Sequence, residues 1–228
     1  MELLEYYLPR PDFTVTPESI EAFEKLANST PPGGQVEYEL PFPKWQYLSY
    51  LCETRDLVLH GSQVMDIEVV EPRLAQDIKA FSNQRAIYAT TDGIWVIYFA
   101  IVNRKKFSPL SLFNSCFQAG VYPDQLSDPM YFFSISYSAL IQEPWCEGAV
   151  YLLPRQAFKQ EPRQNIMGFD VVFPHWISEQ PARPVAVLPV TPDDFPFLQQ
   201  VHGHDDEKLT ELARKNPDGF PWPEALVK

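Results

Sequence analysis

The chain has 228 residues, of which 45% are hydrophobic and 14% aromatic, so it can bury a full core without disulfides or metal ions to reinforce it. Its 30 acidic and 18 basic side chains give a formal net charge of −12, which would repel a nucleic acid backbone over most of the surface. A small anionic ligand such as a dinucleotide remains compatible with this charge, because one or two arginines and oriented backbone amides in a cleft can outweigh a screened surface field.

The cysteines and the N-terminal residues bear on the compartment. Cys52, Cys116 and Cys146 are an odd number at long spacings without a CxxC pair, which favours a reducing environment. The first residues are acidic and broken by proline, unlike a secretory signal, and the longest apolar run, 93–102, is too short to cross a bilayer. We therefore expect a single cytoplasmic domain with no membrane anchor.

The 23 prolines favour short elements joined by stiff loops. Thr16 and Pro17 predict the start of an amphipathic helix, with a threonine cap and a proline at the first helical position. The prolines and glycines at 31–34 break the chain, and residues 36–40 alternate like a half-exposed strand. We expect residues 1–35 to be an N-terminal extension of a core that spans 36–190.

The first half of that core contains a clear strand. Apolar residues at helical spacing predict a helix over 44–55, and the run LVLHGS at 57–62 predicts a buried strand that opens into a functional loop. Residues 63–85 lack strong periodicity and predict a long covering loop with one turn of helix. Residues 86–90, AIYAT, are the next predicted strand.

The second half is richer in β signals. The segment 93–102 fits a buried helix or a strand, and its Asp-Gly start favours the helix. Strands are predicted over 130–141, 148–154 and 184–190, followed by a short helix at Thr191-Pro192. Residues 191–228 are expected to be a polar, proline-rich segment, whose aromatic residues either clamp it onto the domain or form a partner surface: Phe195, Phe197, Phe220 and Trp222.

Three short motifs follow one another along the chain. His60-Gly61-Ser62 ends the first predicted strand, Tyr88 lies in the second, and Glu147 opens the sequence EGAVY. Each alone fits a structural role: a satisfied histidine, a core tyrosine or a solvated acid. In this order and setting, the three resemble the His-Tyr-Glu class of ADP-ribosyltransferases, which includes poly-ADP-ribose polymerases and diphtheria toxin.

The resemblance implies an α+β fold, with a split, strongly bent, mixed or antiparallel β-sheet and flanking short helices, and it implies NAD as the substrate. It assigns His60 to a hydrogen bond with the adenosine ribose and the backbone of Gly61 to the nicotinamide carboxamide. Ser62 and Arg73, the latter near the end of a segment that looks like the family's donor loop, would help to hold the adenosine half.

The remaining assignments concern the nicotinamide end. Tyr88 would pack on the nicotinamide ring, and either Tyr98 or Phe99 would close its other face. Glu147 would hydrogen-bond the ribose 2′-hydroxyl and stabilise positive charge as the nicotinamide–ribose bond breaks, as in the oxocarbenium-like transition state of glycoside hydrolysis. Such a site needs no metal.

Two departures from the family leave alternatives open. The family's serine beside the nicotinamide is absent, since residues 92–95 read Asp-Gly-Ile-Trp, and Gly148 and Ala149 replace bulkier residues. The first hypothesis is a mono-ADP-ribosyltransferase or NAD glycohydrolase whose acceptor, such as a protein, is not identified. The second is an inactive module of the same fold that binds NAD, ADP-ribose or a protein, and the third is an interaction or immunity-type protein without a nucleotide site.

Two other segments offer weaker candidate sites. The sequence HGHDD at 202–206 could be a metal cluster, but a solvated loop is favoured because adjacent ligands on one loop seldom supply tetrahedral geometry. Cys146 could be a nucleophile, but no histidine is placed by sequence to activate it, which favours a buried thiol.

Overall fold

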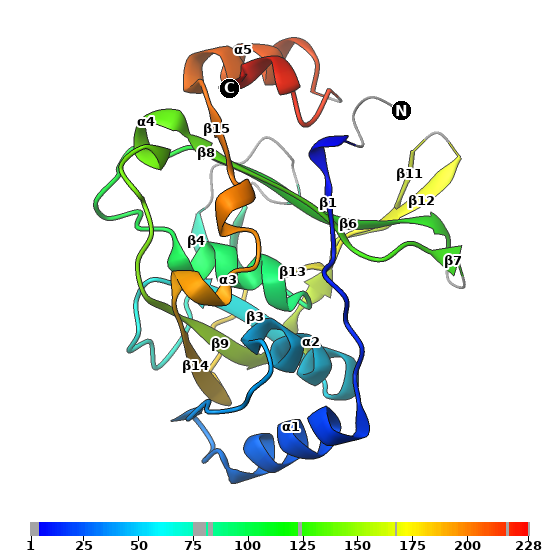
Figure 1. Ribbon diagram of the computed structural model, residues 1–228, viewed down its shortest axis with the longest axis vertical. Coiled ribbons are helices and arrows are strands. Elements are labelled where there is room, and N and C mark those ends of the chain that lie inside the picture. The colour runs from blue at the N-terminus through cyan, green and yellow to red at the C-terminus, as the bar shows by residue number, and fades with distance from the viewer. Residues whose placement is uncertain are drawn as a thin grey trace.

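A computed structural model of the chain describes residues 5–74, 81, 84–122, 125–166, 168–217 and 219–227. Two β-sheets and several short helices make up this part of the chain (Figure 1). The predicted α+β class is therefore confirmed.

We call the sheet that carries all three sequence motifs the second sheet, and the other one the first sheet. The strands of the second sheet lie in the order β10 (Lys159–Gln160), β13 (His175–Ser178), β5 (Arg85–Thr90), β3 (Leu57–Ser62), β9 (Gly148–Pro154), β14 (Ala186–Val190) and β2 (Gly34–Gln35), with β4 (Arg73–Leu74) beside β5. Its pairs are antiparallel except for β14 with β2. The strands predicted around 57–62, 86–90, 148–154 and 184–190 are confirmed.

The first sheet was largely missed from the sequence. Its strands are β11 (Gln164–Ile166), β12 (Phe169–Val172), β6 (Leu112–Val121), β8 (Met130–Ser136), β15 (His202–His204) and β16 (Leu226–Val227), with β1 (Leu8–Pro9) beside β8 and β7 (Gln125–Leu126) beside β6. In Figure 1 the long strands β6 and β8 run across the molecule to an arm formed with β7, β11 and β12.

Three helices begin where the sequence predicted them. Helix α1 spans Pro17–Ser29 behind a Thr16 cap, α2 spans Lys44–Thr54, and α3 spans Gly93–Ile101. The Asp92 carboxylate caps α3 by accepting hydrogen bonds from the backbone of Ile94 at 3.0 Å and Trp95 at 2.7 Å. The helix interpretation of 93–102 is therefore confirmed. The cap explains where α3 begins, because it satisfies two backbone donors of the first helical turn.

The main core joins both sheets through α2 and α3. Side chains of α3 pack together with Leu59 and Leu152 of the second sheet and with Tyr131 and Phe133 of the first. Figure 1 shows α3 between the two sheets. A smaller core covers the opposite face of the second sheet and includes Val58, Ile87, Ala89, Tyr151 and Leu153.

The chain ends are integrated into this fold. Strand β1 pairs with β8, and Phe23 of α1 is 1% exposed within the main core, so the described residues 5–35 pack as part of the fold. In the C-terminal segment Phe195, Phe197 and Trp222 are buried, which confirms that its aromatic residues clamp it onto the domain. The segment also contains helix α5 (Asp206–Lys215).

Several expected boundaries are wrong. Residues 36–40 are not a strand, because the pairing with β14 is already made by Gly34–Gln35. The strand expected over 130–141 ends at Ser136 and is followed by α4 (Tyr137–Leu140), and the helix at Thr191-Pro192 is one 3-10 turn, Pro192–Asp194. Further single 3-10 turns span Arg155–Ala157, Leu198–Gln200 and Pro223–Ala225. The predicted covering loop contains β4. Residues 75–80, 82 and 83 of this loop lie outside the described residues, so the helical turn expected within 63–85 stays a prediction.

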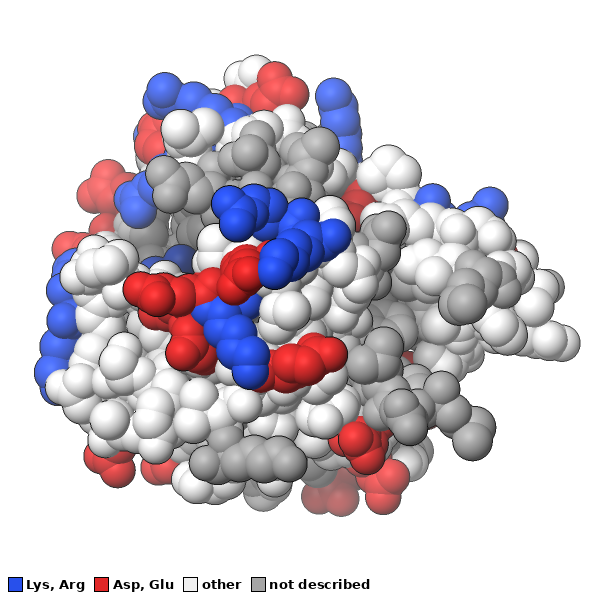
Figure 2. Space-filling model, turned by 90° about the horizontal axis from the view of Figure 1, so that it is seen from above, with Lys and Arg blue, Asp and Glu red and all other residues white. Residues whose placement is uncertain are grey.

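Charge is mixed on the face that carries α5. Figure 2 shows basic and acidic side chains interleaved there, as the α5 sequence DEKLTELARK also indicates. This face therefore lacks the single-sign basic surface that a nucleic acid backbone prefers. Within the described ranges no helix is long and apolar enough to cross a membrane.

Candidate functional site

The three motif strands are neighbours in the second sheet. Strand β3 lies between β5 and β9, so the strand with His60 is flanked by the strand with Tyr88 and by the strand that follows Glu147. β3 and β9 pair along their whole length, whereas β3 and β5 pair only at Leu59 and Thr90. The two strands are therefore not paired beyond this point, on the side where His60 and Gly61 lie.

His60 bridges the unpaired stretch between β3 and β5. Its Nδ1 lies 2.8 Å from the carbonyl oxygen of Tyr88, and because a carbonyl only accepts, Nδ1 carries the proton and Nε2 is the basic nitrogen of the neutral ring. Burial lowers the pKa of His60, and the positive charges of Arg73 and Arg104 lower it further, against the opposing effect of the carbonyl. His60 thus sits as a neutral imidazole near two arginines.

Gly61 allows α3 to approach β3 closely. A Cβ built on Gly61 would lie 2.4 Å from the carbonyl oxygen of Val96 and 3.0 Å from the amide nitrogen of Ala100. Both atoms belong to the backbone of α3, so a larger residue would push the helix away from the sheet. The glycine has a packing reason that is independent of any ligand.

Ser62 and Arg73 lie at opposite ends of the described part of the loop. The Ser62 hydroxyl accepts a hydrogen bond of 3.1 Å from the backbone of Val64 and so shapes the first turn after β3. Arg73 is exposed in the short strand β4, where it pairs with Ala86. Its positive charge contributes to lowering the pKa of His60.

Tyr88 is fixed from two sides. Its hydroxyl donates to the carbonyl oxygen of Gln84 at 2.5 Å and accepts from the Gln84 backbone nitrogen at 3.1 Å. Its ring stacks on that of His175 with centroids 5.9 Å apart and an interplanar angle of 26°. The ring is half-buried and pre-oriented.

Tyr98 and Phe99 differ sharply in exposure. Tyr98 is fully buried in the main core, where its ring packs on Phe133 and Phe195. Its hydroxyl donates a hydrogen bond of 3.2 Å to the Ser134 carbonyl oxygen. Phe99 is half-buried, and the guanidinium of Arg104 lies 5.9 Å from its ring centroid. Of the two expected stacking partners, Tyr98 is occupied by core packing, which leaves Phe99.

Glu147 lies just before β9 and is exposed. Because Tyr151 is the partner of His60, Glu147 is four residues, or about 13 Å, farther along the strand direction. Its neighbour Cys146 is half-buried, and burial raises the pKa of that thiol, with a smaller contribution from the Glu147 charge. The thiol interpretation of Cys146 was therefore only partly right, since it is not fully buried.

Strand register determines which faces the site residues occupy. Partners across an antiparallel pair share a face, and the face alternates along each strand. Leu59 and Thr90 are partners, so Tyr88 shares their face, which α3 covers, whereas His60 points to the opposite face with its partner Tyr151. The structure brings the three strands together, but the imidazole and the phenol leave the sheet on different sides.

His175 and Glu161 form a pair that the sequence analysis missed. The His175 Nδ1 lies 2.9 Å from the Glu161 carboxylate, which also accepts a hydrogen bond from Gln164 at 3.1 Å. The side chains are 12% and 5% exposed. The pair depends on the register of β10 with β13, and no sequence spacing would have indicated it.

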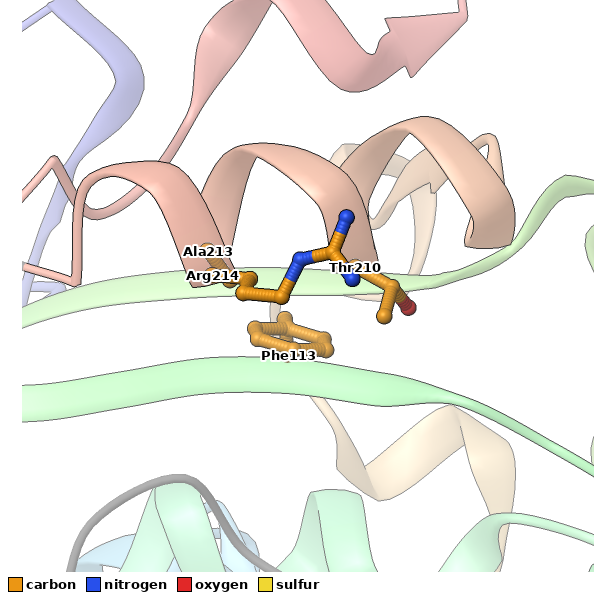
Figure 3. A pocket seen from close by; sticks show the side chains of 4 residues that line it. All are labelled: Phe113, Thr210, Ala213 and Arg214. Carbon is orange, nitrogen blue, oxygen red and sulfur yellow. The ribbon is translucent and has the colours of Figure 1, made fainter.

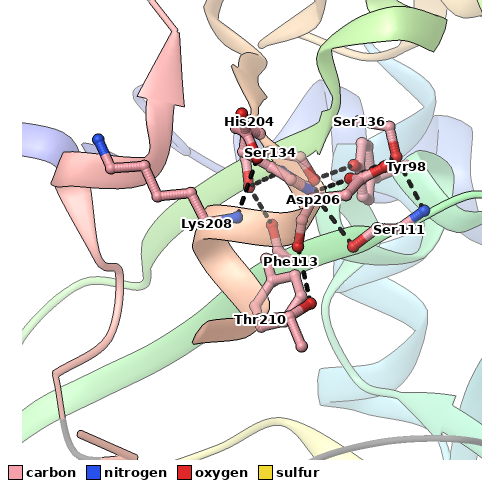
Figure 4. A network of polar contacts seen from close by, with 10 residues as sticks. Tyr98, Ser111, Phe113, Ser134, Ser136, His204, Asp206, Lys208 and Thr210 are labelled. Atoms are coloured by element: carbon pink, nitrogen blue, oxygen red, sulfur yellow. Dashed lines mark hydrogen bonds and ion pairs between the residues drawn. The ribbon is translucent and has the colours of Figure 1, made fainter. Parts of the chain in front are cut away.

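The first sheet contains a second polar network around His204 (Figure 4). His204 is 1% exposed; its Nδ1 lies 2.9 Å from the Ser134 hydroxyl, and its Nε2 lies 3.1 Å from both the Ser111 hydroxyl and the Asp206 carboxylate. The solvated loop predicted at 202–206 is therefore wrong, because β15 pairs with β8 and buries this histidine. The network ties the start of α5 to the first sheet.

A hollow of about 290 Å³ adjoins this network between α5 and β6. Phe113, Thr210, Ala213 and Arg214 line it (Figure 3). A second hollow, of about 270 Å³, lies between the start of α2 and the residues around Asp193. Neither hollow includes a residue of the three motifs.

Over the ranges that the structure describes, no group of three His, Cys, Asp or Glu side chains could hold a metal ion. Comparison of the chain with protein-family models, curated proteins and solved structures found no match.

Proposed function

We propose that this chain binds NAD where β3 and β5 separate and transfers its ADP-ribose portion, as a mono-ADP-ribosyltransferase or NAD glycohydrolase. The observation that carries the proposal is the setting of His60: a neutral imidazole on the central motif strand, hydrogen-bonded to the strand that bears Tyr88, with Arg73 and Arg104 nearby. Two arginines beside a neutral hydrogen-bonding ring suit a diphosphate with an attached ribose.

The separation of β3 from β5 supports a ligand that contacts both faces of the sheet. Since these strands pair only at Leu59 and Thr90, the backbone beyond that pair can hydrogen-bond to a ligand instead of to a neighbouring strand. The adenosine half would then lie toward His60 and the nicotinamide half toward Tyr88.

Glu147 has the chemical role in this proposal. Its carboxylate would stabilise positive charge on the ribose as the bond to nicotinamide breaks, a contribution that matters only in the transition state. The exposed position of Glu147 requires the bound ligand to exclude water from it.

Release of nicotinamide from NAD by the purified chain tests the proposal. We expect turnover that Glu147→Gln lowers on the order of 100-fold without weakening ADP-ribose binding. Glu179→Gln, which changes another exposed carboxylate at the end of β13, is the matched control and should leave turnover unchanged. Absence of nicotinamide release over a broad panel of acceptors would refute the transfer reaction.

A second candidate function, binding of NAD or ADP-ribose without turnover, is favoured by the core position of Tyr98 and by the distance of Glu147 from His60. A ligand at 100 times its Kd stabilises the folded state by about 2.7 kcal/mol, which raises the melting temperature by roughly 5–10 °C for a chain of this size. Such a shift with ADP-ribose, without nicotinamide release, would select this function.

A further inference from the structure

Outside the three motifs, His175 has the most distinctive surroundings of the described residues. The imidazole is packed among three aromatic rings, with centroid distances of 5.3 Å to Phe81, 5.9 Å to Tyr88 and 5.8 Å to Trp95. It lies on the α3 face of the second sheet, the face that Tyr88 also occupies. His175 is therefore part of the same wall as Tyr88.

Glu161 determines which nitrogen of His175 can meet a ligand. Because the carboxylate accepts the hydrogen bond at 2.9 Å, Nδ1 is the protonated nitrogen. This carboxylate is itself oriented by Gln164 and is almost fully buried. It therefore fixes the tautomer of His175, as a neighbouring carboxylate does for many metal-ligating or catalytic histidines.

The remaining nitrogen, Nε2, is then a hydrogen-bond acceptor in the neutral ring. Among the described residues it has no hydrogen-bond partner. An acceptor at the edge of an aromatic wall recognises a flat ring that carries an N–H donor, because the ring can stack while its substituent donates.

We propose that His175, oriented by Glu161, binds the nicotinamide carboxamide of NAD by accepting a hydrogen bond from its amide nitrogen. The proposal rests on the proposed function and deepens it, since it names the residue that selects the amide over the corresponding acid. A carboxylate in place of the carboxamide has no N–H to donate and would place a lone pair against Nε2.

The test compares three dinucleotide ligands by calorimetry on the full chain: NAD, its nicotinic acid analogue and ADP-ribose. We expect the wild-type chain to bind NAD about 10-fold more tightly than the acid analogue, the effect of one hydrogen bond to a partly buried acceptor. His175→Phe keeps the aromatic packing but removes the nitrogen, so it should abolish this preference and leave the ADP-ribose affinity unchanged.

Two further variants separate the hydrogen bond from packing. His175→Gln offers an amide oxygen as an acceptor and should restore part of the preference, while Glu161→Gln frees the tautomer and should reduce it. His202→Phe, on the first sheet, is the control for loss of a half-buried histidine that stacks on a phenylalanine and should change nothing.

The outcomes are distinguishable from failure of the proposed function. If the wild-type chain binds none of the three ligands, the NAD site itself is refuted, and this inference with it. If it binds NAD and ADP-ribose but His175→Phe keeps the amide preference, or weakens ADP-ribose equally, the NAD site stands and the role of His175 is refuted.

Discussion

The contact between Gly61 and α3 gives the sharpest stability prediction. In Gly61→Ala the added methyl would lie 2.4 Å from the Val96 carbonyl oxygen and 3.0 Å from the Ala100 nitrogen, well inside normal contact distances of about 3.5–4.0 Å. Both obstacles are backbone atoms of a helix whose residues Val96 and Ala100 are almost fully buried. The helix must therefore shift by about 1 Å against a close-packed core.

Overpacking of this kind costs about 1–3 kcal/mol, and occasionally more. Because no flexible side chain can yield here, we expect the upper end, about 3 kcal/mol, which lowers the melting temperature by roughly 6–12 °C for a chain of this size. Chemical denaturation and calorimetry would measure the loss of unfolding free energy and the shift in melting temperature.

Gly168→Ala is the matched control. A methyl there meets nothing within 4 Å, but the backbone has a φ of +88°, so only conformational strain of about 1–2 kcal/mol is expected. If Gly61→Ala is no more destabilising than Gly168→Ala, then α3 does not pack on β3 at the distance on which the argument depends.

Two further predictions concern buried polar groups. Asp92→Ala should lower the free energy of unfolding by about 3 kcal/mol in a denaturation experiment, because it removes the cap of α3 and leaves the Tyr131 hydroxyl, which lies 2.6 Å from the carboxylate, without its acceptor. Tyr131→Phe keeps the cap and should lower it by only about 1 kcal/mol. Equal losses in the two variants would contradict the capping role of Asp92. For His60, burial lowers the pKa below the ordinary 6.5, so the unfolded chain binds a proton more readily than the folded chain, and stability should fall as the pH drops from 7 toward 5. His60→Gln should show a shallower decline over that range in parallel melting curves, whereas an unchanged slope would mean that His60 is not held neutral.

Local signals predicted the elements around the site because those elements are largely determined locally. A threonine followed by proline begins α1, an aspartate caps α3, and an uninterrupted apolar run gives β3. In each case the residues that decide the structure are adjacent in the chain, so their pattern is visible without tertiary contacts.

The first sheet was missed because its partners are distant in the sequence. Strand β15 has three residues and pairs in parallel with β8, about seventy positions earlier, as in His204 with Ser136. Short polar segments such as HGH carry no strand periodicity. Their conformation is set by the burial of His204 and its hydrogen bonds to Ser111 and Ser134, which the sequence does not display.

In the candidate site, too, the strands could be predicted from local sequence, whereas the orientation of their side chains depends on distant contacts. Motif order pointed to three strands that lie side by side in the second sheet, but the face of each side chain depends on register, and a one-residue slip reverses it. Because Leu59 pairs with Thr90, the Tyr88 side chain lies on the opposite face of the sheet from His60 and on the same face as His175, on which it stacks. On the proposed function, a ligand that uses both motifs would cross the sheet where β3 and β5 separate, and its nicotinamide end would meet His175. The expected amide preference of the wild-type chain and its loss in His175→Phe would then follow from this register together with the tautomer that Glu161 holds.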